Sequence, residues 1–138
     1  MIIGLALLLI IITRKVTISM TIGCILFILG ETILFRKAKE TVIFYLQPFW
    51  SYADWNIYGP QIIANVVMFI PLGFLLGKLI GWKGLLVAAV FSVIIELIQL
   101  ITKIGMFEFD DIIHNTIGAL IGVLCWKIIQ RLKRGEPC

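Results

Sequence analysis

The chain has 138 residues, of which 61% are hydrophobic and only 14% are charged, and its mean hydropathy is +1.08. Soluble domains carry about 25% charged residues, so this composition excludes a soluble domain and indicates an integral membrane protein surrounded by lipids. The net charge of +4 comes from Lys and Arg at the ends of apolar segments, a placement that anchors membrane helices and does not indicate nucleic-acid binding.

The apolar segments predict an all-α membrane protein, because they are too long for strands and lack the alternation of a membrane barrel. At about 20 residues per span, the chain has room for a bundle of four or five transmembrane helices in one domain, residues 1–138. The expected spans are residues 2–12, 16–35, 61–80, 85–102 and 112–129. Arg14 and Lys15 follow the first segment, which we interpret as a short or tilted helix.

Residues 40–60, between the second and third spans, form a long connection that is rich in aromatic residues. Trp and Tyr favour the headgroup layer of a membrane, because one side of each ring is wet and the other is apolar. We therefore expect this loop to lie along the membrane surface.

Small residues recur at four-residue intervals in two of the spans. Gly73 and Gly77 follow Pro71, which is expected to interrupt the third span, and Gly118 and Gly122 lie in the last span. This spacing lets helix backbones approach closely. It predicts helix packing inside the bundle, and a homodimer through the same GxxxG faces is the alternative.

The distribution of Lys and Arg predicts the orientation. Eight of the twelve lie on the side of the C-terminal tail, and four lie on the side of the aromatic loop and the link at residues 103–110. The positive-inside rule places the C-terminus in the cytoplasm and the other side outward.

Glu96 lies in the middle of the fourth span, among Ile and Leu residues. Exposing an ionised carboxylate at that depth costs roughly 2.5–3.5 kcal/mol, so Glu96 is expected to face the bundle. Ser92, Gln99 and Lys103 share its helix face and extend this polar stripe toward the acidic link. Gln99 is one turn away and is expected to donate a hydrogen bond to Glu96. A desolvated carboxyl of this kind suits a general acid.

The segment 107–118 places three carboxylates within four residues, ahead of the last span. Its polar side chains are Glu108, Asp110, Asp111, His114 and Asn115. One aspartate is expected to cap the last helix, which leaves the rest of the group unexplained. The residues lack a metal-ligand spacing, so a divalent cation is the minor alternative. Asn65 opens the third span, where it either joins helices or completes a site with Asp111 and Asn115.

Several segments resemble the VanZ-like family of small membrane proteins, over about residues 31–130. The matching motifs are QPFWSY at 47–52, NVVMFIPLGFLL at 65–76, ELIQ at 96–99, and residues 107–118 with Gly122. Many members carry an Arg just before the acidic motif, where this chain has IGM at 104–106, and the first acidic position, often Asp, is Glu108 here. The resemblance implies a bacterial plasma-membrane protein linked to glycopeptide (teicoplanin) resistance.

Two classes of function follow. The first is an envelope protein that binds or shields a lipid-linked cell-wall precursor, a glycopeptide or another lipophilic ligand at the outer face. Its binding residues would be Asn65, Gln99, Glu108, Asp110, His114 and Asn115. The alternative is an intramembrane acid/base enzyme acting on a cell-wall or lipid precursor, with Glu96 and Asp111 as its catalytic pair. The sequence has no cofactor motif and no phosphate-binding loop, so no cofactor and no metal are expected.

Overall fold

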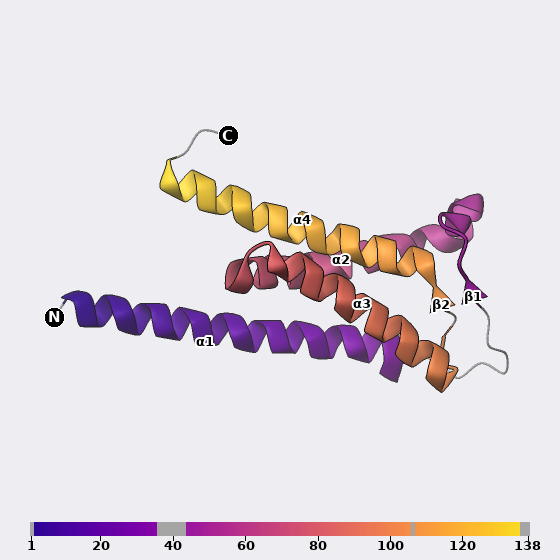
Figure 1. The fold of residues 1–138 in the computed structure, drawn as a ribbon, viewed down its shortest axis with the longest axis horizontal. Helices are drawn as coiled ribbons and strands as arrows, with labels where there is room; N and C mark the ends of the chain where they lie inside the picture. The colour runs from indigo at the N-terminus through magenta and orange to yellow at the C-terminus, as the bar shows by residue number, and fades with distance from the viewer. Residues whose placement is uncertain (1, 36–43, 106, 136–138) are drawn as a thin grey trace.

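The computed structural model describes residues 2–35, 44–105 and 107–135. Within these ranges it contains four long helices: α1 (Ile2–Leu29), α2 (Trp55–Ile80), α3 (Lys83–Thr102) and α4 (Phe109–Arg134). Each helix is long and apolar enough to cross a membrane, which confirms the prediction of an all-α membrane bundle. The start of α1 and the end of α4 lie at one end of the bundle, and the short strands β1 and β2 lie at the other (Figure 1).

The first two predicted spans, 2–12 and 16–35, form one continuous helix. α1 has 28 residues, a length of roughly 42 Å at 1.5 Å per residue. It then continues into a π-helical turn, η1 (Gly30–Leu34). The predicted break at Arg14 and Lys15 was wrong because both residues favour helix and no Gly or Pro lies near them. The described residues therefore contain four segments long and apolar enough to span a membrane, the first of them within residues 11–34.

Helix α2 begins six residues earlier than the predicted 61–80 span. Asp54 precedes its first turn, and the Asp54 carboxylate accepts a hydrogen bond from the Ile57 N–H at 3.4 Å. The predicted interruption at Pro71 was also wrong, since the helix continues through Pro60 and Pro71. Proline is tolerated inside membrane helices where neighbouring helices support the chain.

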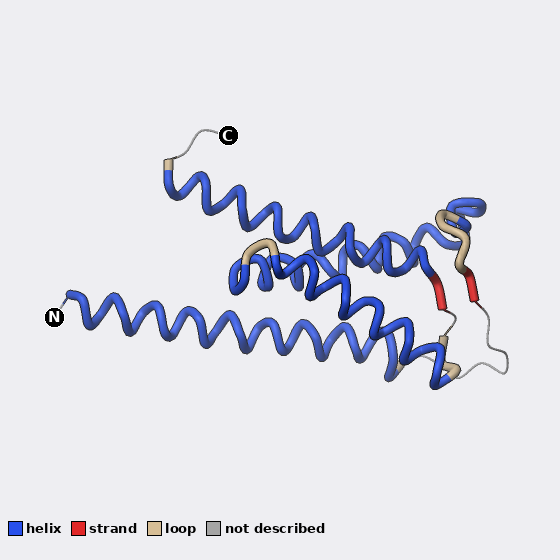
Figure 2. Tube along the Cα trace, in the orientation of Figure 1, coloured by secondary structure: helices blue, strands red, loops and turns tan. Residues whose placement is uncertain are grey.

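The aromatic connection is tied to the acidic link by a small parallel sheet. β1 (Phe44–Tyr45) pairs with β2 (Phe107–Glu108), with Phe44 opposite Phe107 and Tyr45 opposite Glu108. A single 3₁₀ turn, η2 (Trp50–Asp54), leads from β1 into α2. Figure 2 shows the two strands side by side at the end away from the start of α1. Residues 36–43, which follow the predicted second span and include the start of the predicted connection, lie outside the described residues.

The glycine pattern explains how α2 and α4 pack. A Cβ added to Gly118 would collide with the Val66 backbone, and one added to Gly122 would collide with the Ile70 backbone. A Cβ on Gly73 would likewise meet the backbone of Ala119. The predicted helix packing is therefore confirmed within one chain. Both glycine faces are occupied by contacts within the chain.

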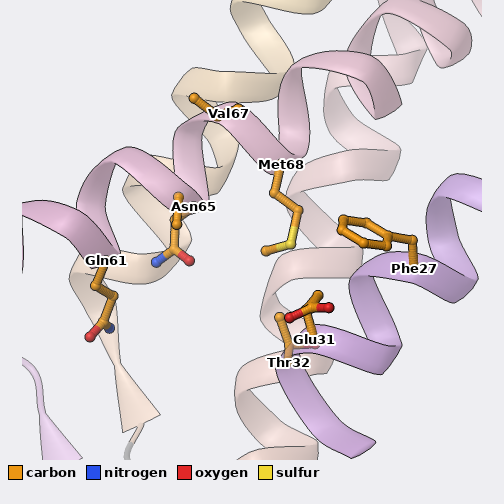
Figure 3. Close-up of a pocket in the computed structure, with 8 residues that line it drawn as sticks. Phe27, Glu31, Thr32, Gln61, Asn65, Val67 and Met68 are labelled. Carbon is orange, nitrogen blue, oxygen red and sulfur yellow. The ribbon is translucent and has the colours of Figure 1, made fainter. Parts of the chain in front are cut away.

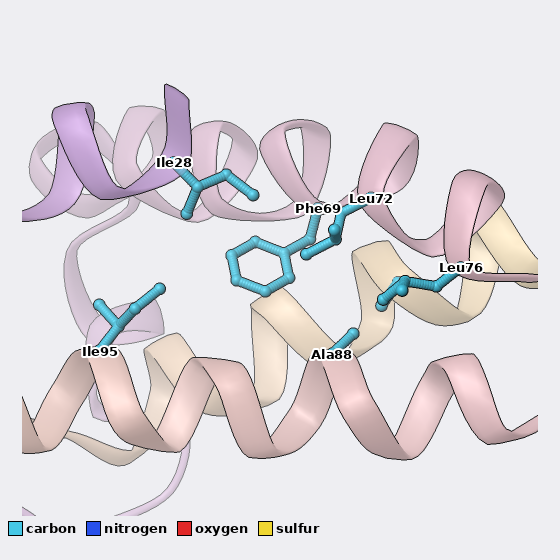
Figure 4. Packing of buried hydrophobic residues seen from close by; sticks show 7 residues of the cluster. Ile28, Phe69, Leu72, Leu76, Ala88 and Ile95 are labelled. Atoms are coloured by element: carbon cyan, nitrogen blue, oxygen red, sulfur yellow. The ribbon is translucent and has the colours of Figure 1, made fainter. Parts of the chain in front are cut away.

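The apolar core is small and lies between all four helices. It consists of Ile28, Phe69, Leu72, Leu76, Ala88, Ile95 and Ala119 (Figure 4). The outward faces are also apolar, with Leu26 62% exposed and Ile101 77% exposed. An apolar surface of this extent suits contact with acyl chains.

Candidate functional site

Buried polar side chains gather at the end of the bundle that carries β1 and β2. This polar cluster consists of Thr32, Ser51, Asn65, Ser92, Glu96, Gln99, Glu108, Asp110, Asp111, His114 and Asn115, each at most 5% exposed. It contains all eight residues that the sequence singled out. Polar groups are costly in a membrane bundle, so such a concentration is a candidate functional site.

Asp110 connects the first turn of α4 to the aromatic loop. Its carboxylate accepts hydrogen bonds from the Phe49 N–H at 2.5 Å, the Ser51 N–H at 3.0 Å and the Ser51 hydroxyl at 2.5 Å. Phe49 adopts a left-handed conformation with φ of 63°, which turns the chain so that both N–H groups face Asp110. The expectation that an aspartate caps α4 was wrong, because Glu108 holds the N-cap position without a side-chain cap.

His114 lies one turn further along α4 and is 1% exposed. Its Nε2 lies 3.0 Å from the Tyr52 hydroxyl, and the two rings are 5.6 Å apart. Its Nδ1 is buried without a hydrogen-bond partner among the described residues. Asp110 and His114 therefore both bind the aromatic loop from α4.

Glu96 accepts a hydrogen bond from the backbone of the acidic link. The Glu108 backbone nitrogen donates to Glu96 Oε2 at 2.9 Å. This hydrogen bond holds β2 against α3. The expected bond from Gln99 to Glu96 was wrong: the Gln99 amide donates to the Thr32 carbonyl at 2.9 Å. The inward-facing stripe comprises Ser92, Glu96 and Gln99, while Lys103 is exposed at the end of α3.

Gln61 is a member of this region that the sequence reasoning missed. Its Nε2 lies 3.2 Å from the Glu108 carboxylate and 3.2 Å from both carboxylate oxygens of Asp111. It thereby links α2 to the acidic link and to α4. Its position one helical turn before Asn65 was the available signal, since residues i and i+4 share a helix face.

The two asparagines differ in their hydrogen bonding. Asn115 donates to the Ser92 hydroxyl at 2.8 Å and joins α4 to α3. Asn65 Nδ2 is buried without a hydrogen-bond partner among the described residues. An unpaired buried amide costs about 1–3 kcal/mol unless a ligand or water satisfies it.

A pocket of about 410 Å³ lies between α1, η1 and α2, beside the polar cluster. Its lining is Phe27, Glu31, Thr32, Gln61, Ala64, Asn65, Val67 and Met68. Figure 3 shows Asn65 and Met68 projecting from α2 toward the space faced by Glu31 and Phe27. Through Gln61, the pocket adjoins the Glu108 and Asp111 carboxylates. The arrangement can accommodate a molecule with a polar and an apolar part.

Metal binding finds little support in the arrangement of these side chains. In the part of the chain that the structure describes, no three His, Cys, Asp or Glu side chains converge as ligands of one ion. The Asp110 carboxylate is instead occupied by Phe49 and Ser51.

Comparisons with known proteins agree with the motifs of the sequence. A family model described as VanZ/LLP1 matches residues 1–130. Protein VanZ from Enterococcus faecium is 39% identical over 75 residues, which cover 51% of this chain and 47% of that protein. The chain thus spans about half the length of this curated relative. No solved structure matches the chain.

Proposed function

We propose, because this chain belongs to the VanZ/LLP1 family, that it contributes to glycopeptide (teicoplanin) resistance from the bacterial plasma membrane. It acts at the outer face of the cell envelope, by binding or shielding a lipid-linked or lipophilic ligand. Its membrane location is supported by four helices of spanning length. The ligand is a membrane lipid, a lipid-linked cell-wall precursor or the glycopeptide itself.

The outward placement of the site follows from charge. The turn between α2 and α3, which carries Lys78 and Lys83, and the basic end of α4 lie on the side of the bundle where α1 starts (Figure 1). Together with Arg14 and Lys15 they give this half eight of the twelve basic residues. The positive-inside rule supports a cytoplasmic C-terminus. The polar cluster and its pocket then face the cell exterior.

The amphipathic pocket is the observation that carries the proposal. It places the polar groups of Glu31, Gln61 and Asn65 beside the apolar side chains of Phe27 and Met68. A lipophilic ligand can satisfy both walls, because its head can contact the polar groups while its chain contacts the apolar ones.

Binding is favoured over acid/base chemistry by the contacts of the proposed catalytic pair. Glu96 is 1% exposed, and one of its oxygens accepts the Glu108 N–H. Both oxygens of Asp111 contact Gln61. Neither carboxylate lines the pocket, whereas a general acid or base must reach its substrate directly or through one water. The enzyme using Glu96 and Asp111 is the second candidate.

The test is a pair of susceptibility measurements in a glycopeptide-sensitive Gram-positive host. The strains would express the wild type, Asp111→Asn or the control Asp54→Asn at matched membrane levels. Asp54 is an exposed carboxylate outside the pocket. We expect the wild type and the control to raise the inhibitory concentration of teicoplanin but not of vancomycin. Asp111→Asn should weaken this effect, because it keeps only one of the two oxygens that contact the Gln61 amide and replaces the other with an NH2 group. A well-expressed wild type without effect on teicoplanin would overturn the proposal.

A further inference from the structure

The pocket between α1 and α2 opens toward the lipid-facing surface of the bundle. Two of its lining residues, Phe27 and Val67, are 59% and 57% exposed. Both lie on helices long enough to span the membrane. Exposed apolar side chains at that depth contact acyl chains rather than water. A membrane lipid can therefore enter the pocket from the side, with its chains along Phe27 and Val67.

The polar wall of the pocket carries one acidic group. Glu31 is exposed in η1, near the outer end of the first span. Among the described residues, its carboxylate has neither a hydrogen-bond donor nor an ion-pair partner. The described lining includes no Lys or Arg. A carboxylate at the membrane edge attracts a cationic head and disfavours an anionic one.

The same wall carries an amide donor that lacks a partner. Asn65 is 5% exposed, and its Nδ2 is buried without an acceptor among the residues that the structure describes. Figure 3 shows the Asn65 side chain reaching from α2 into the space between the helices, with Glu31 on the opposite side. The pocket wall thus carries a negatively charged hydrogen-bond acceptor and, separately, a buried amide donor that lacks a partner.

We propose that this pocket selects a membrane lipid whose headgroup carries a primary ammonium group beside a phosphate. The Glu31 carboxylate accepts hydrogen bonds from the ammonium, and the Asn65 amide donates to a phosphate or ester oxygen. The acyl chains lie against Phe27, Val67 and Met68. This inference rests on the ligand-binding part of the proposed function and names the class of ligand.

The experiment is native mass spectrometry of the purified full chain, delipidated and incubated with three phospholipids of identical acyl chains. The probes are phosphatidylethanolamine, phosphatidylcholine and phosphatidylglycerol in equal amounts. We expect the wild type to retain phosphatidylethanolamine about tenfold more strongly than phosphatidylglycerol, equivalent to about 1.4 kcal/mol. Phosphatidylcholine should bind more weakly than phosphatidylethanolamine, because its quaternary nitrogen has no N–H to donate.

Variants assign the selectivity to individual side chains. Glu31→Gln changes an exposed residue and should lose the preference for phosphatidylethanolamine without unfolding the chain. Asn65→Leu should weaken the retention of all three lipids, and the control Asp54→Asn should match the wild type. Equal retention of phosphatidylethanolamine and phosphatidylglycerol, or of phosphatidylethanolamine and phosphatidylcholine, would overturn the proposal. An unchanged preference in Glu31→Gln would do the same.

Two further arms separate the possible failures. Soluble phosphoethanolamine should not displace the lipid, because it lacks the chains that contact the apolar wall; displacement would refute a lipid occupant. The susceptibility assay in cells is independent of lipid retention. Lipid selection without a teicoplanin effect would leave this inference standing and remove the resistance proposal. A teicoplanin effect without lipid selection would do the opposite.

Discussion

Asp110 and Ser51 are 59 residues apart in the sequence, yet the Asp110 carboxylate accepts both the N–H and the hydroxyl of Ser51. The same carboxylate accepts the Phe49 N–H. Hydrogen bonds to a charged acceptor contribute about 1.5–3 kcal/mol each. This contact therefore makes the aromatic loop and the first turn of α4 one structural unit.

Asp110→Ala should destabilise this unit, because it leaves the buried Ser51 N–H without its acceptor. We expect a loss of about 2–3 kcal/mol in the free energy of unfolding. The measurement is denaturant unfolding in detergent, together with limited proteolysis of the loop at residues 44–54. Asp54→Asn is the matched control, because Asp54 is exposed and asparagine can keep its one long capping bond to the Ile57 N–H. Equal stability and equal proteolysis of the two variants would contradict the assigned role of Asp110.

Gly122→Ala should disrupt the contact between α2 and α4. The added Cβ would collide with backbone atoms of Ile70 and Phe74, and overpacking of this kind costs about 1–3 kcal/mol. We expect a lower melting temperature and less monodisperse protein on size-exclusion chromatography. Gly23→Ala is the control, since a Cβ there meets nothing within 4 Å and alanine favours helix. Similar melting temperatures for the two variants would contradict the close approach of the helices.

Tyr52→Phe tests the contact between the loop and His114. The change removes the hydroxyl 3.0 Å from His114 Nε2 and leaves a buried imidazole without its partner, at a cost of about 1–3 kcal/mol. Thermal unfolding should show the loss. Tyr58→Phe also removes a hydroxyl but leaves His114 untouched, so it should behave as the wild type does. The contact would be refuted if both variants melted at the wild-type temperature.

Much of the fold follows from the sequence, because apolar length and glycine spacing report directly on membrane helices. The four-residue spacing of Gly118 and Gly122 predicts a close helix contact for the last span, and the structure identifies α2 as the partner. The continuity of α1 could not be predicted in the same way. Arg14 and Lys15 interrupt the apolar run, but charged residues that favour helix do not end one.

Eight members of the polar cluster were also predictable, whereas their partners were not. The cost of exposing a carboxylate in the middle of a span indicated that Glu96 faces inward, and Glu96 is buried. The hydrogen bonds of the cluster depend on tertiary contacts between distant segments, as for Asp110 with Ser51. The pocket depends on the placement of η1 beside α2, which no local pattern encodes.

The central claim is that the polar cluster and its pocket bind a ligand and do not catalyse a reaction. The most direct test is to measure the inhibitory concentration of teicoplanin in a host that expresses Glu96→Gln. Glutamine retains an oxygen that can accept the Glu108 N–H, which Glu96 accepts at 2.9 Å, but it cannot take up or release a proton at neutral pH. With membrane levels matched to the wild type, we predict an unchanged rise in the inhibitory concentration of teicoplanin. A complete loss of that rise, from a variant as well folded as the wild type, would contradict the binding account and favour the acid/base enzyme.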